Sequence, residues 1–451
     1  MNIIYELKNK KIAVLGVGLT GSAFIDYLLY NKIYNFECFD EFEIKKEIKE
    51  KLDKFNIKYN KIDLNKDSLL DFDLIFISPG IDRRKKAIKE AIERNIEIVN
   101  DIELVYRAGY RNIIAITGSN GKTTTTTLIG EIFRKKYNTF VGGNIGNAAI
   151  NVLFSPKKYE IIILEISSFQ LESITKFKPN VALILNITED HLDRYNSFDD
   201  YIETKINIAK NQDNNDFLIV NKDDINIINN ISFIKSKILT FSSQTEYANI
   251  YYKDSIIYYN NLPYIHINDI KLKGIHNIEN IMAAILTAKI YNIEDQIIKN
   301  TIINFKPLSH RMQLVKEIKG IKFFNDSKAT NPDSVKRALE TFNDKSVIWI
   351  AGGRGKDTNY NILKSIVKEK VRVAIFLGEE KERLYEEFKC DIPCYTVENL
   401  EEAIKKSLLF AQHGDNIILS PACTSFDQYK SYKERGEHFE KLVNNIREED
   451  I

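Results

Sequence analysis

The sequence predicts an α/β protein, because short apolar runs alternate with helical patterns along most of its 451 residues. The length suggests two to three domains, and we expect three. Apolar runs begin at Lys11, Asp73, Ile113, Glu160, Ala182, Ile321, Ser346, Val371 and Asn416. This alternation is typical of parallel sheets covered by helices. The length exceeds one ordinary core, since domains hold about 100–200 residues each. We expect domains at residues 1–100, 101–307 and 308–451.

One segment breaks this rhythm. From Tyr247 to Lys273, tyrosine, isoleucine and polar residues alternate, which favours antiparallel strands. We therefore expect the central domain to carry a small antiparallel sheet beside its parallel sheet.

Composition excludes several classes of partner. The net charge is +1, so no overall field points to nucleic acid or to an anionic membrane surface. Four scattered cysteines show no metal-ligand spacing, and no stretch approaches the roughly 20 apolar residues that cross a bilayer. The amino terminus has no signal-peptide core. These features predict a cytoplasmic protein with no nucleic-acid partner and no membrane insertion. We also expect a monomer with small-molecule partners, although charge and composition do not determine either.

The first domain carries a glycine-rich turn. Gly16-Val-Gly18-Leu-Thr-Gly21 follows an apolar run, and Asp40 ends the next probable strand. This is the fingerprint of a Rossmann-like nucleotide-binding unit. It suits any nucleotide that carries phosphate, and purely structural glycines remain the alternative. Ser78-Pro79-Gly80 adds a turn at the same expected edge.

A second phosphate-binding pattern opens the central domain. Residues 113–127 read IIAITGSNGKTTTTT, a strand that leads into glycines, a lysine and hydroxyls. Gly118 and Gly121 allow backbone N–H groups to face an anion, and Lys122 supplies a charge for the outer phosphates. Thr123 can ligate Mg²⁺. The spacing is two residues shorter than the standard P-loop, and an ordinary turn followed by a helix remains the alternative.

Three further side chains indicate a function only when they are considered together. Glu165 ends an apolar run, His191 follows another run, and Lys205 lies in a helical pattern. Each would by itself be read as a structural or solvent-facing residue. Together with the loop at Lys122 they point to chemistry on a nucleotide triphosphate.

Eight motifs in order resemble one family. They are TGSNGKTT from Thr117, GGNIG from Gly142, LEISSFQLE from Leu164, NITEDHLDRY from Asn186, GIHNIEN from Gly274, PLSHR from Pro307, NDSKATNPDS from Asn325 and SPACTSFDQYKSYKERG from Ser420. With the GVGLTG turn they resemble the Mur ligase family over nearly the whole chain. That family uses the compact TG-x-N-GK-[ST] loop, and LEISSFQLE and NDSKATN are similar to its D-glutamate-adding branch.

The resemblance implies an ATP-dependent amide ligase of peptidoglycan precursor synthesis, with UDP-N-acetylmuramoyl-L-alanine (UDP-MurNAc-L-Ala), D-glutamate and ATP as substrates. It implies a P-loop-type ATPase domain in the centre and a C-terminal Rossmann-like α/β domain. The implied ATP contacts are Gly118, Ser119, Asn120, Gly121, Lys122, Thr123, Thr124, Asn277, Asn280, Arg311 and Asp326. The implied contacts with the UDP substrate are Thr20, Asp40, Ser78, Gly80, Asn144, Gln170 and His191.

The resemblance also implies the catalytic set and the amino-acid pocket. Lys122, His191 and Lys205 match catalytic positions, and Thr123, Glu165, His191 and Lys205 match ligand positions for two Mg²⁺ ions, with Lys205 carbamylated. Lys328, Thr330, Lys356, Ser425 and Tyr432 match the D-glutamate pocket. Tyr432 stands where a relative carries phenylalanine, and Glu41-Phe42 follows Asp40 where arginine is common, which leaves the uridine diphosphate contacts open.

Three other interpretations compete. One is another three-domain amide ligase, such as a folate polyglutamate synthase or a different Mur enzyme, and the GxGxxG first domain and the SSFQL motif argue against it. A nicotinamide-dependent oxidoreductase accounts for the first domain but leaves Lys122, Glu165 and His191 unexplained. A non-catalytic nucleotide-binding regulator does not account for the intact set of carboxylate, lysine and histidine.

Overall fold

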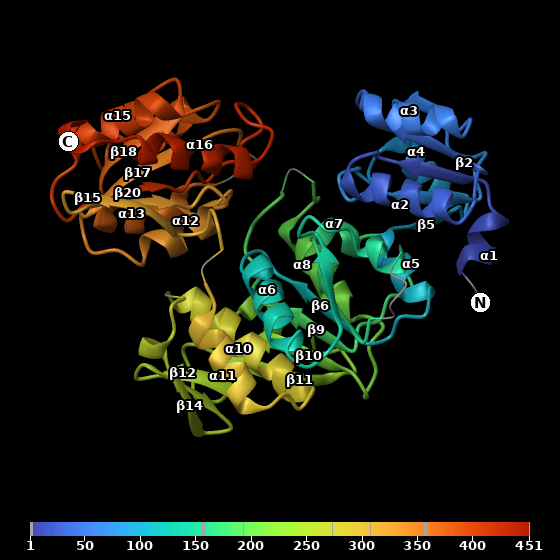
Figure 1. Cartoon of the computed structure of the whole chain (residues 1–451), viewed down its shortest axis with the longest axis horizontal. Helices are drawn as coiled ribbons and strands as arrows, with labels where there is room; N and C mark the ends of the chain where they lie inside the picture. Colours follow the sequence, from blue (N-terminus) through green and yellow to red (C-terminus); the bar gives the residue numbers. More distant parts are fainter. Residues whose placement is uncertain are drawn as a thin grey trace. The chain divides into compact units, whose positions relative to one another are not determined.

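The computed structural model describes residues 3–154, 159–192, 194–272, 274–306, 308–355 and 359–450. It contains three sheets, which are coloured blue, teal to yellow-green, and orange to red along the chain (Figure 1). The mixed α/β class and the three-domain organisation are confirmed. The limits at 100 and 307 stay predictions. By its contacts, the chain forms two compact units: residues 1–187, 199–269 and 279–303, and residues 188–198, 270–278 and 304–451.

The first sheet is parallel, in the order β3-β2-β1-β4-β5. Its strands are β1 (Ile12–Leu15), β2 (Phe36–Asp40), β3 (Tyr59–Lys61), β4 (Leu74–Ile77) and β5 (Glu97–Val99). The helices are α1 (Ile3–Lys8), α2 (Leu19–Tyr30), α3 (Lys46–Lys54) and α4 (Lys86–Glu93). Strands β1 and β4 are buried along their whole length, as expected for central strands of a parallel sheet.

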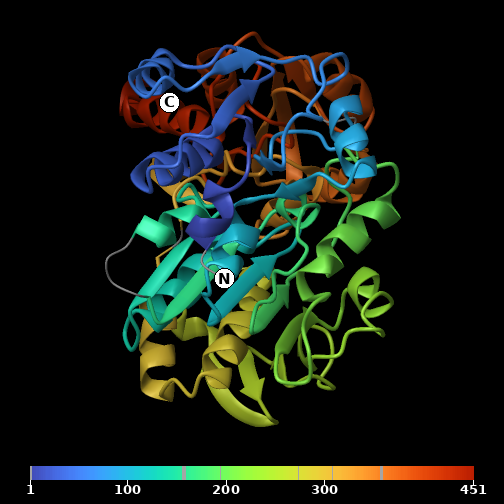
Figure 2. The same cartoon turned by 90° about the vertical axis from the view of Figure 1, so that its right-hand side faces the viewer.

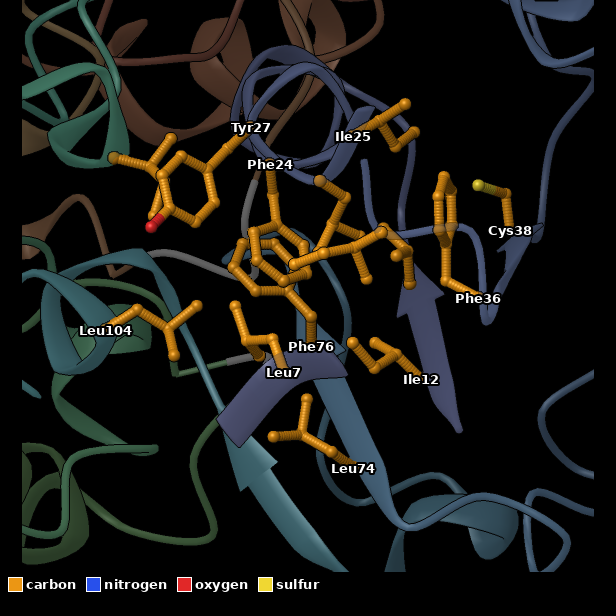
Figure 3. Close-up of a cluster of buried hydrophobic side chains, with 14 of the residues drawn as sticks. Leu7, Ile12, Phe24, Ile25, Tyr27, Phe36, Cys38, Leu74, Phe76 and Leu104 are labelled. Atoms are coloured by element: carbon orange, nitrogen blue, oxygen red, sulfur yellow. The ribbon is translucent and has the colours of Figure 1, made fainter. Parts of the chain in front are cut away.

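A pair of stacked rings lies at the centre of this domain. Phe24 of α2 and Phe76 of β4 pack with their centroids 4.0 Å apart and their planes 14° apart. Leu7, Ile12 and Leu74 surround them (Figure 3). This packing fixes α2, and therefore the glycine-rich turn at its start, against the sheet.

The second sheet has nine strands, in the order β14-β13-β12-β11-β10-β9-β6-β8-β7. They are β6 (Ile113–Thr117), β7 (Thr139–Gly143), β8 (Ile161–Glu165), β9 (Val181–Ile184), β10 (Phe217–Asn221), β11 (Lys237–Ser242), β12 (Ile250–Lys253), β13 (Ile256–Tyr259) and β14 (Leu262–His266). The helices are α5 (Asp101–Arg107), α6 (Lys122–Phe133), α7 (Ser168–Leu171), α8 (Phe198–Ile206), α9 (Ile225–Ile228), α10 (Ile275–Ile290) and α11 (Asp295–Asn304), with short 3₁₀ turns η1 (Ala149–Phe154), η2 (Asn207–Ala209) and η3 (Ile267–Asp269).

The antiparallel strands differ from expectation in one respect. Strands β12, β13 and β14 pair antiparallel with one another, as the alternating pattern predicts. However, β12 also pairs in parallel with β11, so these strands extend the main sheet and do not form a separate small sheet. They are yellow-green in Figure 1 and Figure 2. The hydrophobic pattern sets the faces of a strand and does not determine its partner.

The third sheet has the order β15-β16-β20-β17-β18-β19 and is parallel except for its edge strand β15. Its strands are β15 (Gln313–Ile318), β16 (Ile321–Asn325), β17 (Val347–Gly352), β18 (Val371–Leu377), β19 (Cys394–Thr396) and β20 (Asn416–Leu419). Its helices are α12 (Pro332–Leu339), α13 (Lys364–Lys370), α14 (Lys381–Phe388), α15 (Leu400–Phe410) and α16 (Tyr432–Asn444), with the 3₁₀ turns η4 (Asn361–Leu363) and η5 (Glu448–Asp450). Across the described ranges, no helix combines the length and the apolar content that a membrane crossing requires.

Candidate functional site

The loop between β6 and α6 is built on two glycines in left-handed or extended positive-φ conformations. Gly118 has φ 152° and Gly121 has φ 84°. A Cβ atom at Gly121 would lie 2.3 Å from Oδ1 of Asn280. A side chain at this position would be strained by its backbone angle and would also collide with α10. Gly121 therefore allows the loop to turn directly into the helix.

Asn186, just after β9, fixes the tip of this loop. Its backbone carbonyl accepts a hydrogen bond from Ser119 N at 2.9 Å, and its Oδ1 accepts one from Asn120 N at 2.8 Å. Its Nδ2 donates to the Asn120 carbonyl at 3.2 Å. Strand β9 pairs with β6, so both segments end at the same edge of the sheet. One asparagine therefore determines the loop conformation through three hydrogen bonds.

Two lysine ammonium groups converge on the loop carbonyls. Lys122 Nζ donates to the carbonyls of Gly118 at 2.7 Å and Ser119 at 2.8 Å. Lys205 Nζ donates to the Gly118 carbonyl at 2.9 Å and lies 4.7 Å from the centroid of the Tyr201 ring. Lys205 is only 1% exposed. Two cations and a helix N-terminus at one point form a site for an anion.

The threonines of α6 are buried, in line with a function beyond helix propensity. Thr123 to Thr126 are each at most 9% exposed. Thr125 Oγ1 donates to Asn280 Oδ1 at 3.1 Å, and Thr127 Oγ1 donates to the Thr123 carbonyl at 2.7 Å. These bonds connect α6 to α10 and set the start of α6 beside the loop.

Glu165 presents a buried carboxylate at the same edge. It is 2% exposed and ends β8, which pairs with both β6 and β7. Its Oε1 accepts a hydrogen bond from Asn144 Nδ2 at 3.2 Å, whereas its Oε2 is buried and has no hydrogen-bond partner in the described part of the chain. A buried carboxylate oxygen without a partner is costly, so it indicates a missing ligand such as a metal ion or a donor group. In the described ranges, no three His, Cys, Asp or Glu side chains gather into a metal cluster.

Gln170 has protein partners at both ends of its amide. Its Oε1 accepts hydrogen bonds from Ser167 N at 3.1 Å and Ser167 Oγ at 3.2 Å, which completes the capping box of α7. Its Nε2 donates to Asp101 Oδ1 at 3.2 Å. The other oxygen of Asp101 accepts from Ala149 N at 3.0 Å. Gln170 thus connects α7 to α5, and its contact with a substrate stays a prediction.

In the first domain, Asp40 and Ser78 support the glycine-rich turn. Asp40 Oδ2 accepts a hydrogen bond from Val17 N at 2.7 Å. Ser78 Oγ donates to the Gly16 carbonyl at 2.7 Å. A Cβ atom at Gly21 would lie 1.9 Å from that carbonyl oxygen, so the last glycine of the motif permits close packing. Thr20 is half-buried in the first turn of α2, and Gly80 is exposed after β4.

A cavity of about 790 Å³ opens beside this turn, a size typical of ligand pockets. The first half of α2, the start of α3 and the turn η1 line it. Gly18 and Leu19 contribute to its wall, but Thr20, Asp40, Ser78 and Gly80 do not. The sequence motif therefore locates the turn, whereas the cavity wall consists of helix faces that the motif does not mark.

Several predicted residues belong to the second compact unit. His191 has φ 57°, and its Nε2 lies 3.6 Å from Asp190 Oδ2, which also accepts from Asn331 Nδ2 at 3.1 Å. Asn277, near the start of α10, is 9% exposed and belongs to this unit, whereas Asn280 belongs to the first. The roles of His191, Asn277 and Arg311 in binding stay predictions.

Four residues predicted for the amino-acid pocket follow β16 or β20 in the third domain, namely Lys328, Thr330, Ser425 and Tyr432. Lys328 Nζ lies 5.1 Å from the centroid of the Tyr432 ring, and Lys328 N donates to the His310 carbonyl at 3.1 Å. Thr330 N donates to the Lys328 carbonyl at 2.9 Å. Ser425 is 2% exposed and begins the turn before α16. Lys356 lies outside the described residues.

Arg435 is a buried residue that the sequence reasoning missed. Its guanidinium donates to Ser327 Oγ at 3.0 Å, to the Ser327 carbonyl at 2.9 Å and to the Cys423 carbonyl at 3.2 Å. Longer bonds reach the carbonyls of Thr424 and Gly352. Burial lowers the pKa of this group to about 10, so it remains charged at neutral pH. Arg435 holds together the loops after β16, β17 and β20. In the sequence, Arg435 was marked by the ERG triplet that ends the last of the eight motifs.

Comparison with known proteins gives one consistent result. Residues 10–100 match the Mur ligase MurD-like N-terminal domain, residues 116–288 the Mur ligase middle domain, and residues 310–423 the Mur ligase glutamate ligase domain. The chain is 38% identical to the UDP-N-acetylmuramoylalanine–D-glutamate ligase of Caldicellulosiruptor saccharolyticus, over 98% of this chain and 100% of the relative. It is 39% identical to the protein of that name in Geotalea daltonii, over 97% and 98% of the two chains.

Solved structures are similar in fold. The UDP-N-acetylmuramate-alanine ligase MurC of Thermotoga maritima aligns with a TM-score of 0.61 at 19% identity, over 97% of this chain and 99% of the other. The MurF ligase of the same organism, in complex with ADP, aligns with a TM-score of 0.61 at 16% identity, over 96% and 95%. At these identities the likeness concerns the fold alone.

Asp326 provides a test of the packing in the third domain. Its Oδ2 accepts from Ser420 Oγ at 2.8 Å and its Oδ1 accepts from Met312 N at 3.2 Å, while burial raises its pKa to about 7. Because this pKa exceeds the ordinary value of 3.8, the folded chain keeps a proton that the unfolded chain releases. The free energy of unfolding of wild type should fall relative to that of Asp326→Asn as pH rises from about 4 to about 7. At higher pH the difference between the two should be constant.

Trp349 is the single tryptophan and is buried in this domain, so its fluorescence during thermal unfolding measures the effect. Asp344→Asn is the matched control, since its hydrogen bond with Lys370 lowers the pKa of the Asp344 carboxyl and gives the opposite sign. A difference in melting temperature between wild type and Asp326→Asn that does not change with pH would contradict the assignment.

Proposed function

The chain belongs to the Mur ligase family, and we propose that it joins D-glutamate to UDP-N-acetylmuramoyl-L-alanine at the expense of ATP, in peptidoglycan precursor synthesis. The observation that carries this proposal is the similarity, over 97–98% of the chain, to relatives named for that ligation. The nucleotide loop with its two lysines supports the ATP-dependent part.

The chemistry requires an activated carboxylate, because a carboxylate and an amine do not form an amide at neutral pH. ATP transfers its γ-phosphoryl group to the L-alanyl carboxylate and leaves as ADP. The amine of D-glutamate then attacks the acyl phosphate carbon, and the tetrahedral intermediate collapses with release of inorganic phosphate and a proton. Negative charge spreads over the phosphoryl oxygens in the first step and over the carbonyl oxygen in the second.

Lys122 is the residue that meets the phosphoryl charge. Its ammonium group donates to the carbonyls of Gly118 and Ser119, which lie four and three residues before it, so it lies over the loop that would hold the phosphates. Exchange of these two neutral acceptors for phosphate oxygens strengthens its bonds, since charge-assisted pairs are the stronger ones. Ser119, Asn120 and Thr124 complete the loop, and Asn280 orients it through Thr125.

The residues present fit Mg²⁺. Among the described residues, one buried carboxylate oxygen of Glu165 has no partner, and the Thr123 hydroxyl lies at the start of α6; both are hard oxygen ligands. We assign Thr123, Glu165, His191 and carbamylated Lys205 to two ions. The ions would neutralise phosphate charge and orient the phosphoryl oxygens for in-line transfer. A carbamate at Lys205 would place an anion where the structure has a buried ammonium group beside the Gly118 carbonyl.

The remaining substrate contacts are proposals of the same kind. Thr20, Asp40, Ser78 and Gly80 hold the uridine nucleotide, and Asn144, Gln170 and His191 reach the muramoyl part. Asn277, Arg311 and Asp326 add ATP contacts. Lys328, Thr330, Lys356, Ser425 and Tyr432 bind D-glutamate, whose two carboxylates need cations and hydroxyls. We further propose a cytoplasmic, monomeric enzyme with domains at 1–100, 101–307 and 308–451.

The proposed function predicts strict dependence on one amino acid. ADP release from ATP and UDP-MurNAc-L-Ala should require D-glutamate, whereas meso-diaminopimelate and L-lysine should give no more than background. A diamino acid would place a second amine beside Lys328, and this repulsion excludes it. Lys122→Ala should abolish ADP release while its circular dichroism spectrum stays normal. Efficient use of a diamino acid, or D-glutamate-independent turnover, would refute the proposal.

A second prediction concerns the modification of Lys205. Lys205→Ala should be inactive, because the oxygen ligand of the carbamate is lost, and acetate or another short carboxylate should restore part of the activity. Lys122→Ala is the matched control: it removes a cation beside the same carbonyl, so carboxylates should not rescue it. If no carboxylate rescues Lys205→Ala and the mass of wild type shows no bound CO₂, Lys205 acts as an amine.

A further inference from the structure

Glu103 is a fully buried carboxylate on the helix that joins the first domain to the central domain. This helix is α5, which follows β5 of the first sheet and precedes β6 of the second. The Glu103 side chain is 0% exposed. Glutamate is almost never fully buried unless it is paired, because an ionised carboxylate is costly to remove from water. The groups that bind this carboxylate therefore indicate which parts of the fold Glu103 connects.

The carboxylate binds one segment of the central domain, residues 175–177. Its Oε2 accepts hydrogen bonds from Thr175 N at 3.0 Å and Phe177 N at 2.9 Å, and its Oε1 accepts from Lys176 N at 2.9 Å and from the Thr175 hydroxyl at 2.7 Å. Successive backbone N–H groups that surround one anion form a nest. The segment joins α7 to β9. Glu103 therefore fixes the connection between these two elements of the central domain.

Other side chains of α5 contact the first domain. Leu104 lies in the hydrophobic cluster that includes Phe76 of β4 (Figure 3). Arg107 forms an ion pair with Glu97 of β5, and its Nε donates to Glu103 Oε1 at 3.0 Å. The helix therefore contacts the first domain through Leu104 and Arg107, and Glu103 connects it to the central domain.

The segment that Glu103 binds is also held by residues that follow α8. Lys210 Nζ donates to the carbonyl of Ile174, the residue before the segment, at 2.7 Å. Asn211 Nδ2 donates to two carbonyls of the segment at 2.9 Å each. Helix α8 carries Lys205, which reaches the nucleotide loop. Direct hydrogen bonds therefore connect α5, the segment and the end of the helix that contacts this loop.

We infer that Glu103 is a positioning residue, which holds the first domain at a fixed place relative to the nucleotide loop. This inference rests on the proposed function, since it takes the UDP substrate as the ligand of the first domain and ATP as the ligand of the loop. The L-alanyl carboxylate and the γ-phosphoryl group are then supplied by different domains, and transfer requires the reacting atoms to lie about 3–3.5 Å apart. A misplacement of about 1 Å can cost about a hundredfold in rate. Glu103 then acts on kcat and leaves the affinity for each nucleotide unchanged.

The kinetic test replaces the carboxylate by an amide of the same shape. Glu103→Gln should lower kcat at least about tenfold, because the amide NH₂ group faces N–H donors and the segment loses an acceptor. The Kd of ATP and the Kd of UDP should each change less than about twofold. Asp415→Asn is the control: Asp415 is a buried carboxylate of the third domain that accepts from Gln412 N at 2.6 Å and pairs with Arg372. This control should retain the wild-type kcat. A folded Glu103→Gln variant with wild-type kcat would overturn the inference.

Spin labels test the placement of the first domain without catalysis. They are attached at Lys54→Cys on α3 and at Lys135→Cys after α6, in a chain whose two incompletely buried cysteines, Cys390 and Cys394, are replaced by serine. Double electron–electron resonance should give one narrow distance distribution when Glu103 is present and a broader one in Glu103→Gln. Equal widths would overturn the inference, even if kcat falls. The measurement needs no substrate, so it keeps its meaning if the D-glutamate assay fails, and the two proposals can fail separately.

Discussion

The candidate site depends on the convergence of adjacent parallel strands at one edge. Strand β6 lies between β8 and β9, so the segments after these three strands must share the same small volume. Asn186 fixes the arrangement of these segments, because its backbone carbonyl and its side chain both form hydrogen bonds with the loop after β6. Each such hydrogen bond contributes about 1 kcal/mol net, but a buried partner left without one costs about 1–3 kcal/mol. The loop therefore keeps this conformation mainly because other conformations would leave buried polar groups without hydrogen bonds.

This constraint also explains how the free protein accommodates its charges. Lys122 and Lys205 would be costly to bury without partners, and the loop carbonyls of Gly118 and Ser119 supply neutral acceptors. In the part of the chain that the structure describes, one oxygen of Glu165 has no such partner. The site therefore contains two ammonium groups that donate to neutral carbonyls and, within the described ranges, a buried carboxylate oxygen with no hydrogen-bond partner. A phosphate group would offer anionic acceptors to the two ammonium groups, and a cation would offer a partner to the carboxylate oxygen.

Much of the fold could be predicted from the sequence, because parallel strands buried on both faces read as continuous apolar runs. All nine runs, from Ile12–Leu15 to Asn416–Leu419, form strands. The pairing of β12 with β11 could not be predicted, because it depends on contacts that the alternating pattern does not encode. The motifs also located the loop at Lys122 and the carboxylate of Glu165, because the loop directly follows one buried strand and Glu165 ends another.

The supporting contacts were not predictable, because they join residues far apart in the chain. Asn186 lies 66 residues from Asn120, and Arg435 lies 108 residues from Ser327. Gln170 and Asp40 were assigned to substrates, yet the fold also uses them to fix a helix start and a turn. Residues of this kind affect binding because they hold other groups in position. A motif alone does not distinguish such a residue from one that contacts the substrate.

The most direct test of this account is calorimetric titration of ATP with Mg²⁺ into Asn186→Ala. The variant should bind ATP at least about tenfold more weakly than wild type, because the loop loses both side-chain hydrogen bonds at Asn120. Asn249→Ala is the control, since it removes a comparable bond to Thr240 N on the same sheet, away from the loop. Wild-type affinity in a correctly folded Asn186→Ala variant would contradict the claim that the convergence of strand ends creates the site.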